Sequence, residues 1–241
     1  MSVDALFFGA HPDDVELTSG GLAALLASHG HAVGIVDLTR GEAASRGTAE
    51  ERAQEAAAAA VALGVAGRST LALPDLGLDR GDPAQLRAVV ACLREQRPRL
   101  VVAPDRHDAH PDHVEASHLV ARACYLAGLA RFSAAGERHR PERVLFALYR
   151  TSASPHVVVD ITPVWERRSA ALAAHRSQMG GGAGSATYLT MPDFPAEVEA
   201  RARVFGAAIG ARYGEGYRSR GPVAVRDARA LLGGVHSGGG R

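Results

Sequence analysis

Short apolar runs alternate along the chain with longer segments whose apolar residues recur at helical spacing. The short runs predict buried strands, because strands covered on both faces of a sheet are apolar throughout. They cover residues 3–8, 32–38, 70–73, 100–103, 144–148 and 157–161. The longer segments predict helices at residues 18–29, 49–63, 83–97, 111–129, 163–178 and 195–213. This alternation is typical of an α/β domain with a parallel sheet.

The length of the chain sets the domain organisation that we expect. Its 241 residues fit one domain. We predict a Rossmann-like three-layer αβα fold, with residues 1–150 as the core. Residues 151–232 then add a strand and helices that complete the substrate pocket of the same domain, and residues 233–241 form a disordered tail. The glycine-rich segment 180–185 is either a mobile lid or a plain linker.

Polar segments follow three of the predicted strands. They read AHPDD after the first strand, TRGE after the second and PDRHDAHPDH after the fourth. Ligands of open parallel sheets bind beyond the carboxyl ends of the strands. The sequence therefore predicts that these three segments meet in one site.

The basic residues exclude several kinds of chemistry. All 27 are arginines, and the chain contains no lysine. Schiff-base chemistry, a pyridoxal-phosphate anchor and a Walker A phosphate loop all need lysine and are excluded. The 26 acidic residues nearly balance the arginines, so no nucleic-acid partner is indicated.

Cysteine use and hydropathy indicate a compartment. Cys92 and Cys124 lie in predicted helices without a CxxC motif, which favours two reduced core residues. No stretch has the roughly 18–20 apolar residues of a membrane span, and the N-terminus lacks the features of a signal peptide. We therefore expect a cytoplasmic protein without a membrane partner.

Histidine and aspartate residues in two of the strand-end segments indicate a metal site. Pro12 restricts His11 to extended geometry, and Asp14 follows close enough to bind the same ion. The segment 107–113 supplies three histidines, of which one would complete a set of three ligands. Three protein ligands and an open position are typical of catalytic zinc, although Fe²⁺, Co²⁺ or Mn²⁺ would also suit these donors. Alternatively, these residues only cap helices.

The same segments resemble a known family. The residues GAHPDDVEL, VDLTRGEAASRGTAEER, the following LGV and LPD, and PDRHDAHPDH are similar to the LmbE/PIG-L-like zinc-dependent de-N-acetylases over residues 3–128. The TRGE…RGT run, AAHRSQ and IGARYGEGY resemble more closely the bacillithiol-biosynthesis deacetylases, which act on N-acetylglucosaminyl-malate. The resemblance implies that residues 1–150 are a metal-binding deacetylase core. It also implies a homo-oligomer, with hexamers common among relatives.

The resemblance assigns roles to six residues. It implies one Zn²⁺ per chain, held by His11, Asp14 and His113. It makes Asp13 the general base for a zinc-bound water that attacks the amide carbonyl. It also implies that His110 stabilises the oxyanion and that Asp112 orients the His110 imidazole.

Arginines on the same loops are candidates for the substrate. A malate group carries two carboxylates, which arginine binds in a bidentate manner. The resemblance favours Arg52 and Arg106, followed by Arg46, while Arg40 is as consistent with a structural role. Glu42 either binds a sugar hydroxyl or anchors its loop. Further residues have open roles: Tyr213, Glu215 and Tyr217 either close the sugar pocket or lie in the core, and His175 and Gln178 have no assigned function.

Two other functions stay open. One is the same de-N-acetylation of another amino sugar, such as a mycothiol precursor or a chitobiose-type disaccharide. The other is a non-catalytic sugar-binding relative, which would have no need for Asp13. A dinucleotide oxidoreductase is excluded because no GxGxxG motif follows the first strand.

Overall fold

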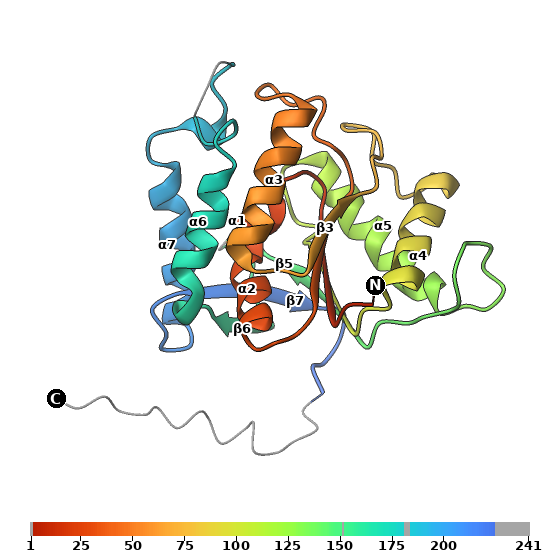
Figure 1. Ribbon diagram of the computed structural model, residues 1–241. Coiled ribbons are helices and arrows are strands. Elements are labelled where there is room, and N and C mark those ends of the chain that lie inside the picture. The colour runs from red at the N-terminus through yellow and green to blue at the C-terminus, as the bar shows by residue number, and fades with distance from the viewer. Residues whose placement is uncertain (1, 151, 181–183, 225–241) are drawn as a thin grey trace.

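A single seven-stranded sheet forms the centre of the computed structural model, which describes residues 2–150, 152–180 and 184–224. The strand order is β3-β2-β1-β4-β5-β7-β6 (Figure 1). The strands are β1 Ala5–Gly9, β2 Val33–Asp37, β3 Gly67–Thr70, β4 Leu100–Pro104, β5 Arg143–Ala147, β6 Val157–Asp160 and β7 Gly214–Ser219. Strands β1 to β5 are parallel, and β7 is antiparallel to both of its neighbours. The expected α/β fold with a mostly parallel sheet is confirmed.

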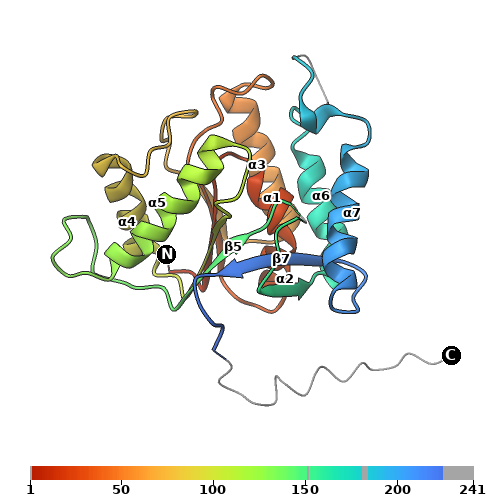
Figure 2. The same ribbon diagram turned by 180° about the vertical axis from the view of Figure 1, so that it is seen from behind.

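Helices cover both faces of this sheet (Figures 1 and 2). They are α1 Asp14–Thr18, α2 Gly20–Ser28, α3 Ala49–Leu63, α4 Pro83–Gln96, α5 Pro111–Ala127, α6 Trp165–Ala174 and α7 Phe194–Ala207, with short 3₁₀ helices η1 Thr162–Val164 and η2 Tyr188–Thr190. Helices α4 and α5 lie together on one face, and α2, α3 and α6 lie on the other. No helix in the described part of the chain is long and apolar enough to cross a membrane.

Alternate residues of β1 belong to the two cores. Leu6 and Phe8 pack with residues of α4 and α5, while Ala5 and Phe7 pack with residues of α2 and α3. Successive side chains of a strand point to opposite faces, so a strand between two helical layers is apolar at every position. This double burial explains why the run is continuous, and it fixes where β1 ends and the polar segment after it begins.

Four predicted elements differ from the structure. The predicted strand 70–73 shares only Thr70 with β3, and the predicted helix 163–178 is the 3₁₀ turn η1 followed by α6, which ends at Ala174. The segment 18–29 is interrupted at Ser19, because α1 ends there and α2 starts with Gly20. The predicted helix 195–213 ends at Ala207, and the missed strand β7 follows it. Its sequence, GEGYRS, has neither apolar alternation nor a β-branched residue, so the usual strand signal is absent.

Neither the expected disordered tail, residues 233–241, nor positions 181–183 of the glycine-rich segment lie within the described residues. The boundary at residue 150 also stays a prediction, and the sheet crosses it, since β5 from before the boundary pairs with β7 from after it.

Candidate active site

Two loops at the carboxyl ends of adjacent strands form the site. The first joins β1 to α1 and carries His11, Asp13 and Asp14, and the second joins β4 to α5 and carries His110. Helix α5 begins at this second loop, with His110 as its N-cap and Pro111 at its first position. His113 follows in the first turn of α5. The parallel pairing of β1 with β4 therefore brings together the two motifs that the sequence analysis singled out.

Asp13 has a strained backbone. Its φ angle is 143°, in a region that favours glycine, and the residue is only 5% exposed. Such a conformation costs about 1–3 kcal/mol and persists only where the surrounding structure enforces it. Strain of this kind is concentrated at functional sites, so it marks Asp13 as a residue positioned for chemistry.

Asp14 lies between two imidazoles. One of its carboxylate oxygens is 3.5 Å from Nδ1 of His11, and the other is 3.1 Å from Nε2 of His113. Two ligand atoms about 2.0–2.1 Å from a tetrahedral ion are separated by about 3.3 Å, and both contacts are near this spacing, although they use different oxygens of Asp14. His110 is close enough to form an alternative set, since its ring nitrogen and those of His11 and His113 lie within 4.8 Å of one another. Among the described residues, a second group with ligand atoms within 4.8 Å of one another is His11, Asp75 and Asp112.

Carboxylates also contact the second ring nitrogen of each of these two histidines. Nε2 of His11 is 3.1 Å from Asp75 and 3.4 Å from Asp112, and Nδ1 of His113 is 3.1 Å from Asp108. Histidines that bind metals commonly donate their second N–H to a carboxylate, which fixes the tautomer and the orientation of the ring. Sequence reasoning missed these roles for Asp75 and Asp108, although both belong to the quoted LPD and HDAHPDH segments.

The carboxylates determine the protonation of both histidines. Burial lowers the pKa of His11, but hydrogen bonds to Asp112, Asp14 and Asp75 outweigh it and raise the pKa to about 12. Burial likewise lowers the pKa of His113, while the charge of Asp14 and a hydrogen bond to Asp108 raise it to about 10. The site is therefore an environment that strongly favours positive charge, as a cation site must be.

Asp13 differs electrostatically from its neighbour Asp14. Burial raises the pKa of Asp13, partly offset by the charge of Arg52, whose guanidinium nitrogen is 3.5 Å from the carboxylate. The charge of His113 and hydrogen bonds to both histidines overcome the effect of burial and lower the pKa of Asp14. Adjacent carboxylates whose pKa values move in opposite directions are suited to separate tasks, here a proton acceptor and a metal ligand.

His110 is oriented by the main chain. Its Nδ1 accepts a hydrogen bond from the backbone N–H of Asp112 at 3.2 Å, so the neutral ring carries its proton on Nε2. Burial and the charges of His113 and His11 lower the pKa of His110, which favours this neutral form. The Asp112 carboxylate faces His11 and accepts the backbone N–H of Leu76. The structure thus links Asp112 to His110 through its amide, and not through the side chain that we expected.

Arg52 and Arg46 are engaged by the protein itself. Arg52 donates to the carbonyls of Gly41 and Pro12 at 3.1 and 2.9 Å, and it is 3% exposed. Arg46 is also buried and donates to the carbonyls of Ser177, Gly184 and Ser185. Both guanidinium groups therefore hold loops around the site, and neither presents an open fork to a substrate carboxylate.

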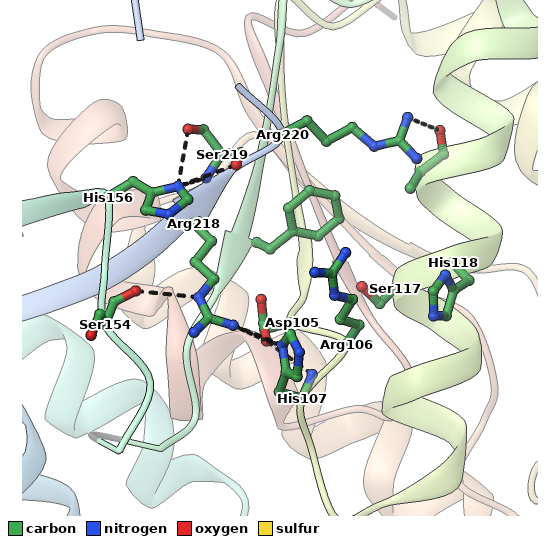
Figure 3. Close-up of a pocket in the computed structure, with 12 residues that line it drawn as sticks. Asp105, Arg106, His107, Ser117, His118, Ser154, His156, Arg218, Ser219 and Arg220 are labelled. Carbon is green, nitrogen blue, oxygen red and sulfur yellow. Dashed lines mark hydrogen bonds and ion pairs between the residues drawn. The ribbon is translucent and has the colours of Figure 1, made fainter. Parts of the chain in front are cut away.

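The other expected binding residues lie apart from the metal ligands. Glu42 accepts the backbone N–H groups of Arg40 and Asp75, so it anchors the loop that carries Asp75. Arg106 lines a separate pocket (Figure 3). No ligand of the candidate metal site lines that pocket among the described residues.

The C-terminal motif residues lie in the interior. Glu215 accepts the backbone N–H groups of Gly21 and Leu22 at 2.7 and 2.8 Å and the hydroxyl of the buried Tyr217 at 2.6 Å. It therefore caps α2 and joins it to β7. Further polar residues are buried nearby: His175 lies 3.4 Å from Glu16, Gln178 donates to the Arg46 carbonyl, and Tyr213 stacks on Trp165.

Comparisons with known proteins identify the family of this chain. A family model described as PIG-L, GlcNAc-PI de-N-acetylase, matches residues 6–124. A Rhodococcus opacus protein named 1D-myo-inositol 2-acetamido-2-deoxy-alpha-D-glucopyranoside deacetylase is 34% identical over 54% of this chain and 56% of its own length. The diacetylchitobiose deacetylase of Thermococcus kodakarensis is 31% identical over 70% of this chain and 67% of its own.

A solved structure matches more of the chain. The crystal structure of the conserved protein TT1542 from Thermus thermophilus is 38% identical, covers 92% of this chain and 97% of that chain, and has a TM-score of 0.85. The chain belongs to the PIG-L family of de-N-acetylases. The family resemblance is confirmed. The Rhodococcus and Thermococcus relatives are named for an inositol glycoside and for diacetylchitobiose, and not for N-acetylglucosaminyl-malate. The match spans less than two thirds of the length of the Rhodococcus relative.

Proposed function

We propose that this protein is a hydrolase that removes the acetyl group from an N-acetylglucosamine glycoside with one bound divalent metal ion. The observation that carries the proposal is the division of labour between Asp14 and Asp13. Asp14 lies between two imidazoles at ligand spacing, and Asp13 is a strained, buried carboxylate beside it with a raised pKa. A sugar-binding protein would have no use for such a base.

The residues of the site have separate roles in amide hydrolysis. His11, Asp14 and His113 would hold the metal, and their mixed donors suit Zn²⁺. When bound, the ion supplies a Lewis acid for the water and the amide carbonyl. Asp13 takes a proton from the attacking water, and the Nε2–H of His110 donates to the carbonyl oxygen as it becomes negative. Asp13 holds this proton until the C–N bond breaks and the leaving nitrogen takes it, which yields acetate and the free amine.

The arginine geometry favours a glycoside with a neutral second group. A malate substrate would need an accessible guanidinium fork, but Arg52 and Arg46 are buried on backbone carbonyls and Arg106 lies in another pocket. The named substrates of the two reported curated relatives, an inositol glycoside and diacetylchitobiose, carry no carboxylate. We therefore propose a neutral N-acetylglucosaminyl glycoside, with N-acetylglucosaminyl-malate as the second candidate.

Acetate release from a panel of substrates tests this proposal. The panel contains N-acetylglucosaminyl-inositol, diacetylchitobiose and N-acetylglucosaminyl-malate, each with enzyme that is zinc-loaded or stripped by chelation. We expect release from the neutral glycosides that stops on stripping and returns with zinc. Binding of these sugars without acetate release would support the sugar-binding alternative, and activity that survives exhaustive chelation would contradict the metal site. Faster turnover of the malate conjugate would favour the second candidate.

A further inference from the structure

A pocket lies beside the β4–α5 loop, between that loop, α5 and the ends of β5 and β7 (Figure 3). Its volume is about 660 Å³. Small-molecule sites usually measure roughly 300–1,000 Å³, so the pocket has room for a metabolite. It has no role in the chemistry proposed above, because the candidate ligands and base all lie outside its lining.

Cationic groups dominate this pocket. Arg106, Arg218 and Arg220 line it, together with three histidines at positions 107, 118 and 156. Among the described residues, Asp105 supplies the only carboxylate in its lining. Three guanidinium groups against one carboxylate leave an excess of positive charge in a concave surface, where low-dielectric walls strengthen its field.

The single carboxylate is already neutralised. Asp105 is buried, and its Oδ1 lies 3.0 Å from Nδ1 of His107 and 3.6 Å from the Arg218 guanidinium. Arg218 also lies 2.7 Å from His107 Nδ1 and donates to the Ser154 carbonyl at 3.2 Å. These contacts hold Arg218 in place within the pocket and leave some of its N–H groups free for a ligand.

Arg106 is the most available donor. Its side chain makes no hydrogen bond or ion pair with any residue that the structure describes, and Figure 3 shows it between His107 and Ser117. Burial lowers the pKa of His118, and the charges of Arg80, Arg106 and Arg220 lower it further against the opposing effect of Glu115. The field that His118 experiences is therefore positive on balance.

We propose that this pocket binds a small organic anion, with its phosphate or carboxylate groups held by Arg106 and Arg218. Guanidinium forks match both kinds of oxyanion. The side chains of Phe146 and Ala121 give the pocket an apolar wall against which the body of the ligand packs. The site is separate from the metal centre, although the β4–α5 loop supplies residues to both.

Calorimetric titration of the full-length protein with inorganic phosphate and with succinate tests the proposal, and the two anions distinguish phosphate from dicarboxylate chemistry. We expect at least one to bind with the same affinity in zinc-loaded and metal-free protein. Arg106→Gln and Arg218→Gln should each weaken binding about tenfold, as expected for loss of a charge-assisted hydrogen bond. Arg87→Gln makes the same charge change at an exposed position of α4 outside the pocket and should leave binding unchanged.

Three results would overturn the proposal. Binding that disappears on removal of the metal would place the anion at the metal centre. Equal weakening in all three variants would show a diffuse effect of net charge, and absence of binding for both anions would show that the pocket holds no anion. Because Arg218 also supports the Ser154 loop, Arg106→Gln decides the outcome if Arg218→Gln does not fold.

Discussion

The carboxylates behind the two histidines should control the affinity for zinc, and Asp108→Asn is the most informative change. Asp108 accepts the backbone N–H of His110 at 3.0 Å and also contacts Nδ1 of His113 at 3.1 Å. An asparagine has only one oxygen, so keeping the bond to His110 turns its NH₂ group towards His113. Nδ1 would then accept a hydrogen bond from that NH₂ group, and the neutral ring would carry its proton on Nε2, the atom needed by the metal.

The structure also predicts an order of effects. His113 has Asp108 as its only carboxylate partner on Nδ1 among the described residues, whereas His11 has both Asp75 and Asp112 on Nε2. Loss of such a partner costs about 10–100-fold in metal affinity. We therefore expect Asp108→Asn to lie near the 100-fold end, about 2.7 kcal/mol, and Asp75→Asn near the tenfold end, about 1.4 kcal/mol.

Competition with a chromophoric chelator measures the zinc Kd of each variant, and circular dichroism confirms that it is folded. Asp193→Asn is the matched control, because this exposed carboxylate makes no side-chain cap bond. An Asp108→Asn Kd within about threefold of the parent would show that Asp108 does not orient His113 for the metal, since loss of a carboxylate partner of a metal-binding histidine normally costs more. A greater loss in Asp75→Asn than in Asp108→Asn would refute the predicted order.

Three further predictions concern protons and packing. Because the pKa values of His11 and His113 are raised to about 12 and about 10, both histidines are protonated at pH 7 in the metal-free protein. Zinc binding should therefore release about two protons, and the affinity for zinc should rise with pH. Calorimetry in buffers of different ionisation enthalpy counts the released protons, and a count of zero would contradict the assignment of these two ligands. Arg52→Met leaves Asp13 without its cationic neighbour, which should raise the pKa of Asp13 and move the acid limb of the pH profile of kcat/KM to higher pH. An acid limb that does not move would show that it does not report the ionisation of Asp13. A Cβ at Gly21 would lie 2.7 Å from a side-chain atom of Ile161, so Gly21→Ala should lower the free energy of unfolding by about 1–3 kcal/mol. Gly67→Ala is the control, because a Cβ at Gly67 meets open space, and it should leave the melting temperature unchanged. Equal melting temperatures of the two variants would show that the packing around Gly21 relaxes.

The sequence predicted those parts of the fold that depend on local signals. The predicted helix 49–63 matches α3 because its ends carry local signals: Thr48 and Glu51 form a capping box, and Gly64 ends the helix in a left-handed conformation. The proximity of the two histidine- and aspartate-containing motifs could also be predicted, because a parallel sheet brings the carboxyl ends of β1 and β4 to the same edge. Strand β7 escaped prediction because its stability comes from long-range partners, as when Glu215 caps α2 nearly two hundred residues away in sequence.

The roles of single side chains were harder to predict. The sequence does not distinguish an arginine that faces the substrate from one that donates to a backbone carbonyl. In the structure, Arg52 and Arg46 donate to backbone carbonyls. Asp75 comes from a loop between β3 and α4, so only the tertiary structure reveals its contact with His11. Arg106 lies only four residues before His110, yet it lines a different pocket.

Asp13 is assigned as a base that does not hold the metal, and the decisive experiment for this role is Asp13→Asn. Zinc content and acetate release from N-acetylglucosaminyl-inositol or diacetylchitobiose are measured on the same preparation, with the parent protein alongside. We predict one zinc per chain and a rate lowered by about 10²–10⁴-fold, the usual contribution of a general base. Full activity with bound zinc would show that Asp13 is not the base, and loss of the zinc itself would show that Asp13 holds the metal.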